Sequence, residues 1–419
     1  MSVAAPVLPE SAAPKPSAPP RRFVAILVLV LGVLTATGPL ATDLYLPAFP
    51  QIATDLRAPQ SQVQLTLTAA MLGLALGQLI IGPMSDAWGR RRPLLIGTLV
   101  FTVTSALCMA VFGVGFFIAL RFVQGMAGAA GAVIGRAIVR DHFDGDGVTR
   151  FFSRLTLVSM LAPMLGPILG AQLLNLGSWR LGFGVLTAVS AISLALSYFL
   201  LPESLPADRR PSPSISTLWT NIRRLLRDPR FIGPTLTLAL VFGMMFTYIS
   251  SFSFVSQQQF GVTAQQYSLI FAINTVGILS GTQLNAFLIG RIDTGRRLYG
   301  GLVAAGTAVG VLVVLAATGE PPLPVVVGAL FVMMFGAGVI FPNCTSLALG
   351  SQPAEVAGTG SALMGTLQFT IGGTVPAAAS WTADGAVCLL SMVTVMVVVL
   401  AMAVPVFVVS ARRALRSAV

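Results

Sequence analysis

The sequence predicts an all-α membrane protein in which 12 transmembrane helices form two pseudo-symmetric six-helix bundles. Composition is the first reason: of the 419 residues, 55% are hydrophobic and only 9% are charged, and the mean hydropathy is +0.87. An average soluble domain has about 25% charged residues. The second reason is that the apolar residues fall into a dozen stretches, each close to the ~20 residues with which a helix spans a bilayer. A polar break after the sixth stretch divides the chain into halves.

The elements follow in chain order. Residues 1–21 consist mainly of Ala, Pro and Ser, which predicts a disordered cytoplasmic tail. The N-terminal bundle is expected at 22–201, with apolar stretches at about 22–49, 62–82, 94–112, 115–138, 151–175 and 181–201. A cytoplasmic linker occupies 202–229. The C-terminal bundle is expected at 230–411, with stretches at about 231–255, 266–290, 298–318, 322–349, 357–380 and 385–410, and a second tail at 412–419.

Two patterns within these stretches predict topology and packing. If the N-terminus is cytoplasmic, the loops on the cytoplasmic side and the two tails carry 21 of the 25 Lys and Arg residues, whereas the outer loops carry only Arg57 and Arg180. This asymmetry predicts that both termini are cytoplasmic. Small residues four apart predict close helix approach, and the pairs are Gly73 with Gly77 and Gly131 with Gly135.

The linker contains a second predicted element. Leu218, Ile222, Leu225 and Leu226 recur at helical spacing, and arginines occupy the other faces. This pattern is typical of a basic amphipathic helix on the inner membrane surface. A merely solvated connector is the alternative.

The residue inventory excludes several functions. The only lysine, Lys15, lies in the tail, so the chain has no phosphate-binding loop of the type that ends in Gly-Lys. The single His142 and the three dispersed cysteines give neither a metal site nor a hydrolase centre. We therefore expect no metal, no cofactor and no enzymatic activity. The basic excess lies in short loops, which argues against nucleic acid. A receptor or scaffold would need a sizeable soluble domain or long binding loops, and the sequence predicts neither.

Charges within apolar stretches are costly and are therefore functional candidates. Asp43 stands late in the first stretch, which runs outward from the cytoplasm. Arg121 lies early in the fourth stretch, which enters the membrane from the outer side. The two are expected at comparable depth, where an ion pair would offset their desolvation. Gln124 shares the face of Arg121. A purely structural ion pair is the alternative.

Several motifs resemble those of one family. Gly82-Pro83-Met84-Ser85-Asp86-Ala87-Trp88-Gly89-Arg90-Arg91 is similar to the loop 2–3 signature of the major facilitator superfamily. Arg121-Phe122-Val123-Gln124-Gly125 is similar to its fourth-helix motif, and Ala162-Pro163-Met164-Leu165-Gly166-Pro167-Ile168-Leu169-Gly170 to its antiporter motif in the fifth helix. Together with Thr42-Asp43-Leu44-Tyr45-Leu46-Pro47, these resemble the Bcr/CflA branch of bicyclomycin and chloramphenicol exporters. The chain departs from the patterns at Ala87 and Ala171. It carries Thr35 and Thr37 where some relatives are thought to have another carboxylate.

The resemblance implies the major facilitator fold and a monomeric, proton-driven exporter in a bacterial inner membrane. Asp43 and Arg121 are the expected proton-coupling residues. Six residues are expected to latch the outward-facing state, namely Gly82, Asp86, Gly89, Arg90, Arg91 and Asp141. In this latch Asp86 is expected to accept hydrogen bonds from the N-terminus of a neighbouring helix, and Gly82 and Gly89 to permit the tight approach. Four are expected to kink the fifth helix or let it slide, namely Pro163, Gly166, Pro167 and Gly170. The alternative for the arginines of the latch is that they only determine the orientation of the chain in the membrane.

The substrate is expected near the midplane, between the halves. Aromatic and amide side chains in the apolar stretches are the candidates for contacting it, namely Tyr45, Gln124, Tyr248, Phe252, Asn274, Asn343 and Gln368. With one candidate carboxylate, a small neutral amphipathic drug of phenicol or bicyclomycin type fits better than a dication. Transport of a natural metabolite by the same fold is the alternative.

Overall fold

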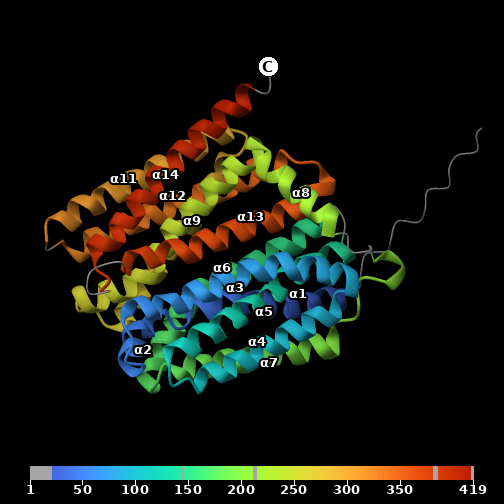
Figure 1. Ribbon diagram of the computed structural model, residues 1–419, viewed down its shortest axis with the longest axis horizontal. Helices are drawn as coiled ribbons and strands as arrows, with labels where there is room; N and C mark the ends of the chain where they lie inside the picture. The colour runs from blue at the N-terminus through green and yellow to red at the C-terminus, as the bar shows by residue number, and fades with distance from the viewer. Residues whose placement is uncertain (1–20, 144–145, 211–214, 320, 381–385, 417–419) are drawn as a thin grey trace, which may run out of the picture.

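The computed structural model describes residues 21–143, 146–210, 215–319, 321–380 and 386–416. Twelve described helices of 19 to 31 residues form two stacked groups of six, and the described residues contain no strand (Figure 1). The first group comprises α1 (Arg21–Asp43), α3 (Gln60–Trp88), α4 (Arg91–Met109), α5 (Val114–His142), α6 (Asp146–Leu176) and α7 (Arg180–Leu200). The second comprises α9 (Pro229–Phe254), α10 (Ala264–Leu288), α11 (Thr294–Ala317), α12 (Leu323–Gly350), α13 (Ala354–Thr374) and α14 (Leu389–Arg416).

These bounds confirm the predicted fold. Ten of the helices are long and apolar enough to cross a membrane, and α6 and α13 are the other two long ones. The protein is a multi-pass membrane protein. The predicted tail at 1–21 lies outside the described residues except for Arg21, where α1 begins. At the other terminus α14 continues to Arg416, into the stretch expected to be a tail.

Short elements join or extend the long helices. A 3₁₀ turn, η1 (Leu46–Ala48), and the helix α2 (Phe49–Asp55) continue the chain after α1. A π-helical segment, η3 (Val255–Gln259), ends α9, and a 3₁₀ segment, η4 (Val375–Ser380), ends α13. Between the halves lie a 3₁₀ turn, η2 (Ala207–Arg209), and a helix within the predicted linker, α8 (Ile215–Arg227).

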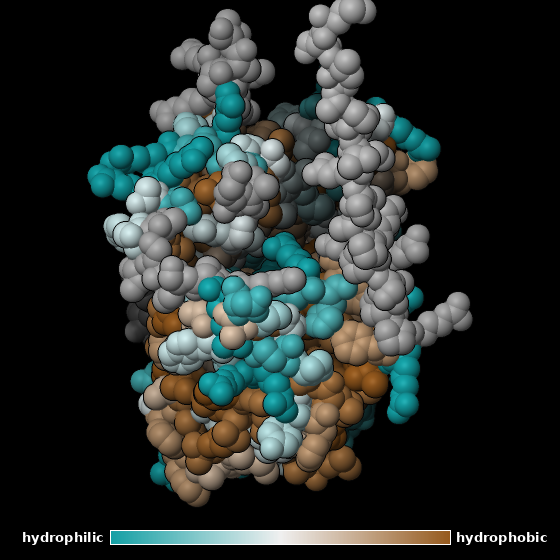
Figure 2. Space-filling model, turned by 90° about the vertical axis from the view of Figure 1, so that its right-hand side faces the viewer, coloured by the Kyte–Doolittle hydropathy of each residue, from teal (hydrophilic) through white to brown (hydrophobic). Residues whose placement is uncertain are grey.

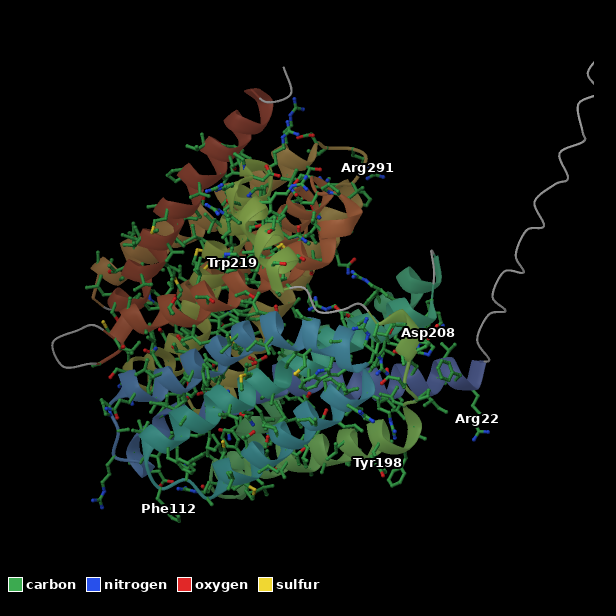
Figure 3. All side chains as sticks on the ribbon, turned by 45° about the vertical axis from the view of Figure 1, so that its right-hand side comes forward. Arg22, Phe112, Tyr198, Asp208, Trp219 and Arg291 are labelled. Atoms are coloured by element: carbon green, nitrogen blue, oxygen red, sulfur yellow. The ribbon has the colours of Figure 1, made fainter. Side chains whose placement is uncertain are left out.

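The linker helix packs its apolar side against α9 and α13 of the second half. Leu225 is fully buried and Ile222 packs on the core. Trp219, labelled in Figure 3, has 68% of its surface exposed, and Arg223, one turn further along α8, is exposed as well. The apolar face is therefore shared between the protein and the surroundings, and a position of α8 on the membrane surface stays a prediction.

Glycines set how closely the helices pack within each half. A side chain at Gly73 of α3 would collide with the carbonyl oxygen of Phe122 on α5. In the second half, a side chain at Gly281 of α10 would collide with the carbonyl oxygen of Phe335 on α12. The same backbone contact thus recurs at matching positions of the two halves, as pseudo-symmetry requires. Between the halves, α3 packs on α13 and α10 packs on α6.

The two ends of the helix bundle differ in charge. Arg22, Asp208 and Arg291 lie toward one end, and Phe112 lies at the other (Figure 3). We call the first the arginine-rich end because Arg90–Arg92, Arg140 and the arginines of α8 also belong to it. Hydrophilic side chains gather on it (Figure 2). The opposite end includes the turns around residues 44–60, 110–113, 177–180, 255–263 and 318–319.

Candidate functional site

The two halves are joined by hydrogen bonds at the opposite end. Gln60 Nε2 donates to Gln258 Oε1, and Gln64 Nε2 donates to Ser251 Oγ (3.1 Å). Gln257 Nε2 donates to the carbonyl of Pro47 (3.1 Å) and Gln265 Nε2 to that of Ala171 (3.1 Å). We call this set the glutamine seal, made of Gln60, Gln64, Gln257, Gln258 and Gln265. It contains no charged side chain.

A further hydrogen bond joins the halves away from the seal, from the hydroxyl of Thr366 on α13 to the carbonyl of Ala75 on α3 (3.2 Å). Toward the arginine-rich end a cavity lies between the halves. Its volume is about 340 Å³. Helices α1, α3, α5 and α6 of the first half and α13 of the second supply its walls. Polar side chains line it at Thr35, Gln78, Arg136, Ser361 and Gln368. The structure is therefore closed at the opposite end, with its cavity on the arginine-rich side.

Asp43 lies at the C-terminal end of α1, on the sealed side of the molecule. It is 5% exposed and is the only acid among the buried side chains of the described residues. The hydroxyl of Thr42 donates to its Oδ1 (3.1 Å). Behind it stands Gly166 of α6, where an added Cβ would lie 3.2 Å from the Cβ of Asp43. No described cation forms an ion pair with this carboxyl group.

Arg121 is fully buried, but it does not bind Asp43. Its Nη2 donates to the carbonyl of Ala41 (2.9 Å), its Nη1 donates to Gln124, and its guanidinium lies 4.5 Å from the ring centre of Tyr45. The ion pair anticipated from the sequence is thus not formed in this structure. A helix leaves its last carbonyls without partners, and Ala41 in the last turn of α1 offers one of them. The carbonyl oxygen of Ala41 and the ring face of Tyr45 thus take the place expected for the Asp43 carboxylate.

Most of the predicted substrate residues are packed inside a half in this conformation. The Tyr45 hydroxyl bonds Thr66, Gln124 donates to Ser105 (2.7 Å), and Asn274 donates to the Tyr248 hydroxyl (2.8 Å). The remaining candidates are the fully buried Phe252, Asn343, which donates to Asn285 (2.7 Å), and Gln368. Of the set, only Gln368 lines the cavity.

Eight buried side-chain polar atoms have no hydrogen-bond partner within the described residues, and two of them lie close together in the sequence of the second half. These two are Asn274 Oδ1 and the hydroxyl of Tyr267, both on α10. Such atoms are rare in native structures and mark places where another state or a ligand supplies a partner. Sequence reasoning missed Tyr267, because an aromatic residue in an apolar helix is most often packing.

Helix α6 contacts both halves near Asp43. A side chain at Gly170 would collide with the carbonyl oxygen of Leu44, so α6 approaches the end of α1 backbone to backbone. Pro163 and Pro167 lie inside the helix, which continues unbroken to Leu176. Its other side packs on α10 of the second half. The helix is therefore placed to transmit a change at Asp43 across the interface between the halves.

The predicted latch residues gather around Arg90 at the arginine-rich end. Its guanidinium pairs with Asp86, with Asp141 (3.1 Å) and with the hydroxyl of Ser85 (2.9 Å). Although partial burial acts to lower the pKa of Arg90, the bonds to Asp86 and Asp141 hold it above its ordinary value. Arg90 thus ties the α3–α4 turn to the end of α5.

The cluster differs from the expected latch in two ways. Asp86, expected to accept from the N-terminus of a neighbouring helix, pairs with Arg90 instead. Gly82 meets only a side-chain atom of Val133, 3.7 Å from an added Cβ, so it permits no tight approach here. The described contacts of the cluster stay within the first half and the start of the linker. The cluster does not join the halves in this conformation.

Glu203, which sequence reasoning missed, completes the cluster. Its carboxylate accepts from the backbone N–H of Arg90 (2.7 Å) and of Arg91 (3.2 Å), so it caps the N-terminus of α4. Gly89 adopts φ +89°, and an added Cβ would crowd this carboxylate. Partial burial acts to raise the pKa of Glu203. The N–H groups of Leu205, Arg90 and Arg91, together with the charge of Arg210, outweigh burial and lower it. The sequence signal that could have identified Glu203 is an acid directly after the sixth apolar stretch, at the end where the loop arginines lie.

The chemistry of this arrangement is that of a carrier. No group of three or more His, Cys, Asp or Glu side chains within the described ranges could hold a metal ion. The family model described as Major Facilitator Superfamily matches residues 30–377. The chain belongs to the major facilitator superfamily. It is a transporter and not an enzyme.

Relatives of this transporter include proteins named for drug resistance. It is 39% identical to an uncharacterized MFS-type transporter, YdgK, of Bacillus subtilis, covering 83% of this chain and 87% of that one. It is 32% identical to the bicyclomycin resistance protein homolog of Haemophilus influenzae, with the same coverage. It is 27% identical to the chloramphenicol resistance protein CraA of Acinetobacter baumannii, covering 79% of each. These relatives support the Bcr/CflA branch.

Among solved structures, the transporter resembles a bacterial homolog of the human lysosomal transporter Spinster in an inward-facing, unoccupied conformation. The TM-score is 0.73 at 14% identity, covering 94% of this chain and 98% of that one. At this identity the likeness shows the fold alone.

Proposed function

We propose that this transporter exports a small, weakly polar drug of phenicol or bicyclomycin type in exchange for protons. The names of two relatives support this drug class. We further propose that it works as a monomer in a bacterial inner membrane, with both termini cytoplasmic and no cofactor. The concentration of basic residues at the arginine-rich end supports this orientation. The cavity then faces the cytoplasm, and the glutamine seal closes the outer side.

The burial of Asp43 without a cation is the observation that carries the proposal. A carboxylate in a dry site with one hydroxyl donor is costly as an anion, and taking up a proton removes that cost. Asp43 therefore has two charge states that differ greatly in their fit to this site. Because α6 approaches the end of α1 so closely at Gly170, a change of charge at Asp43 acts on the helix that contacts the second half.

These contacts support the following exchange. Asp43 takes up a proton while the cavity faces outward, and the drug leaves. After the change of conformation, drug entry from the cytoplasm displaces the proton. One charge moved across 100 mV supplies about 2.3 kcal/mol, which sustains a gradient of roughly fiftyfold for a neutral drug.

Reconstitution into liposomes with an imposed pH gradient tests the proposal. Chloramphenicol and bicyclomycin are the probes, and proton flux and drug movement are both recorded. We expect drug-dependent proton flux in the wild type. We expect none in Asp43→Asn, which should retain drug exchange without a gradient. Asp55→Asn is the matched control, because this acid is half-exposed at the opposite end, in an ion pair with Arg180.

Two results would contradict the proposal. Full proton-driven transport by Asp43→Asn excludes this residue as the proton carrier. If neither drug moves protons in the wild type, the drug assignment fails and transport of a natural metabolite is favoured.

A further inference from the structure

The cavity wall carries a positive charge that the exchange mechanism does not use. Arg136 of α5 lines the cavity, and no acid is among the described lining residues. One turn further along the same face of α5 stands the exposed Arg140. The nearest acid in the sequence, Asp141, is already held by Arg90 and by the hydroxyl of Ser204 (2.7 Å). The charge of Arg136 is thus left without a counter-ion in the described part of the protein.

The donors of Arg136 are largely free as well. Its Nε donates to the carbonyl of Ala132 (3.0 Å), whereas its two Nη atoms make no hydrogen bond to the described residues. The side chains of Gln78, Ser361 and Gln368, which also line the cavity, make none either. Arg121, a third arginine of α5, differs from the exposed Arg136 because it is fully buried and bonded on both Nη atoms.

These groups together form a polar wall suited to an anion. A guanidinium presents paired donors that match the two oxygens of a carboxylate, and amides on facing helices add further donors. Gln78 comes from the first half and Gln368 from the second. Phe152 and Phe369 supply apolar wall for the rest of a ligand. The volume of about 340 Å³ lies in the range of drug-sized pockets.

We propose that Arg136, with Gln78 and Gln368, forms a subsite for an anionic group, so that among compounds of the proposed drug class the cavity binds a carboxylate-bearing derivative more tightly than its neutral parent. This inference rests on the proposed function, because it names the class of compound that the same cavity takes. A lipid headgroup has the same anionic chemistry. The position of Arg136 on a wall between the halves favours a solute.

Equilibrium binding to the purified protein tests this inference without any gradient. The probes are chloramphenicol and its hemisuccinate ester, which share the arene and differ by a terminal carboxylate. In nanodiscs of phosphatidylcholine, we expect the wild type to bind the hemisuccinate about tenfold more tightly, as a charge-assisted pair implies. Arg136→Gln should weaken hemisuccinate binding about tenfold and change chloramphenicol binding less than about threefold. Arg136→Lys should keep most of the preference.

The control is Arg57→Gln, an exposed arginine at the opposite end, which should bind both probes as the wild type does. Equal binding of the two probes by the wild type would overturn the inference. The inference would also be overturned if Arg136→Gln weakened the binding of both probes equally, because Arg136 would then have a structural role. Competition by phosphatidylglycerol in the nanodiscs would assign the site to lipid. If the wild type shows no drug-dependent proton flux in liposomes but still binds the hemisuccinate more tightly than chloramphenicol, the proposed function is contradicted and the anion site is retained.

Discussion

Replacing Gln60 with alanine removes two hydrogen bonds that join the halves at the opposite end. Gln60 Nε2 donates to Gln258, and its Oε1 accepts from the backbone N–H of Val387 (2.8 Å). Both partners belong to the second half, more than 190 residues away in the sequence. The bonds exist only while that end is closed, so their loss raises the free energy of the closed state alone.

The size of the shift follows from these two bonds. A typical intramolecular hydrogen bond contributes about 0.5–1.5 kcal/mol, and these partly exposed ones fall in the lower part of that range. Losing both costs about 1–2 kcal/mol, so the ratio of open to closed molecules at that end should rise roughly 5- to 30-fold. The halves should move apart at the opposite end and together at the arginine-rich end.

Distance measurement between two spin labels detects this shift. The labels are placed at Phe112→Cys and Thr318→Cys, both exposed at the opposite end but in different halves, with the three native cysteines replaced by serine. The matched control is Gln51→Ala, which loses one bond within the first half, to the backbone N–H of Trp179 (3.2 Å). Gln60→Ala should enrich the longer distances, and Gln51→Ala should not. Identical distance distributions in the two variants would refute the role given to the seal.

Three further variants test other contacts. Glu203→Gln should lower the free energy of unfolding by about 1 kcal/mol at pH 7. Because the folded-state pKa of Glu203 is lowered, the difference in stability from the wild type is present above pH 4.5 and vanishes as the pH falls through the lowered value, which thermal melts at a series of pH values measure. The control Asp208→Asn, which removes an exposed acid of the same linker, should melt as the wild type does at pH 7. Gly170→Ala should force α6 away from α1 at a cost of about 1–3 kcal/mol and slow transport, whereas Gly115→Ala, which has open space, should do neither. Arg121→Lys keeps the charge but cannot span its carbonyl, amide and aromatic contacts, so we expect a folded protein with transport slowed about tenfold or more.

The sequence predicted the helices well because hydropathy alone determines which segments enter a membrane. The predicted stretch at 62–82 became α3 (Gln60–Trp88), which adds two polar residues at its start and, at its end, the mixed segment 83–88 that contains Ser85 and Asp86. The linker helix followed from its periodicity. The close helix approach predicted at Gly73, Gly77 and Gly131 is present, whereas an added Cβ at Gly135 would make only an ordinary contact with Leu31, 3.7 Å away.

Side-chain partners could not be predicted in the same way. Arg121 and Asp43 were expected to pair because both are charged, yet the guanidinium binds a backbone carbonyl, which every residue carries and no sequence pattern marks. The glutamine seal joins residues such as Gln60 and Gln258 that have no local signal in common. Arg136 was visible as a charge within an apolar stretch. Only the three-dimensional arrangement showed that it borders a cavity from which described acids are absent.

Counting the protons released when a drug binds tests the role of Asp43 most directly. Calorimetric titration of the purified protein with chloramphenicol, repeated in buffers of different ionisation enthalpy, gives that number. The account predicts release of up to one proton by the wild type, varying with pH, and none by Asp43→Asn. Undiminished proton release by Asp43→Asn would show that another group carries the proton.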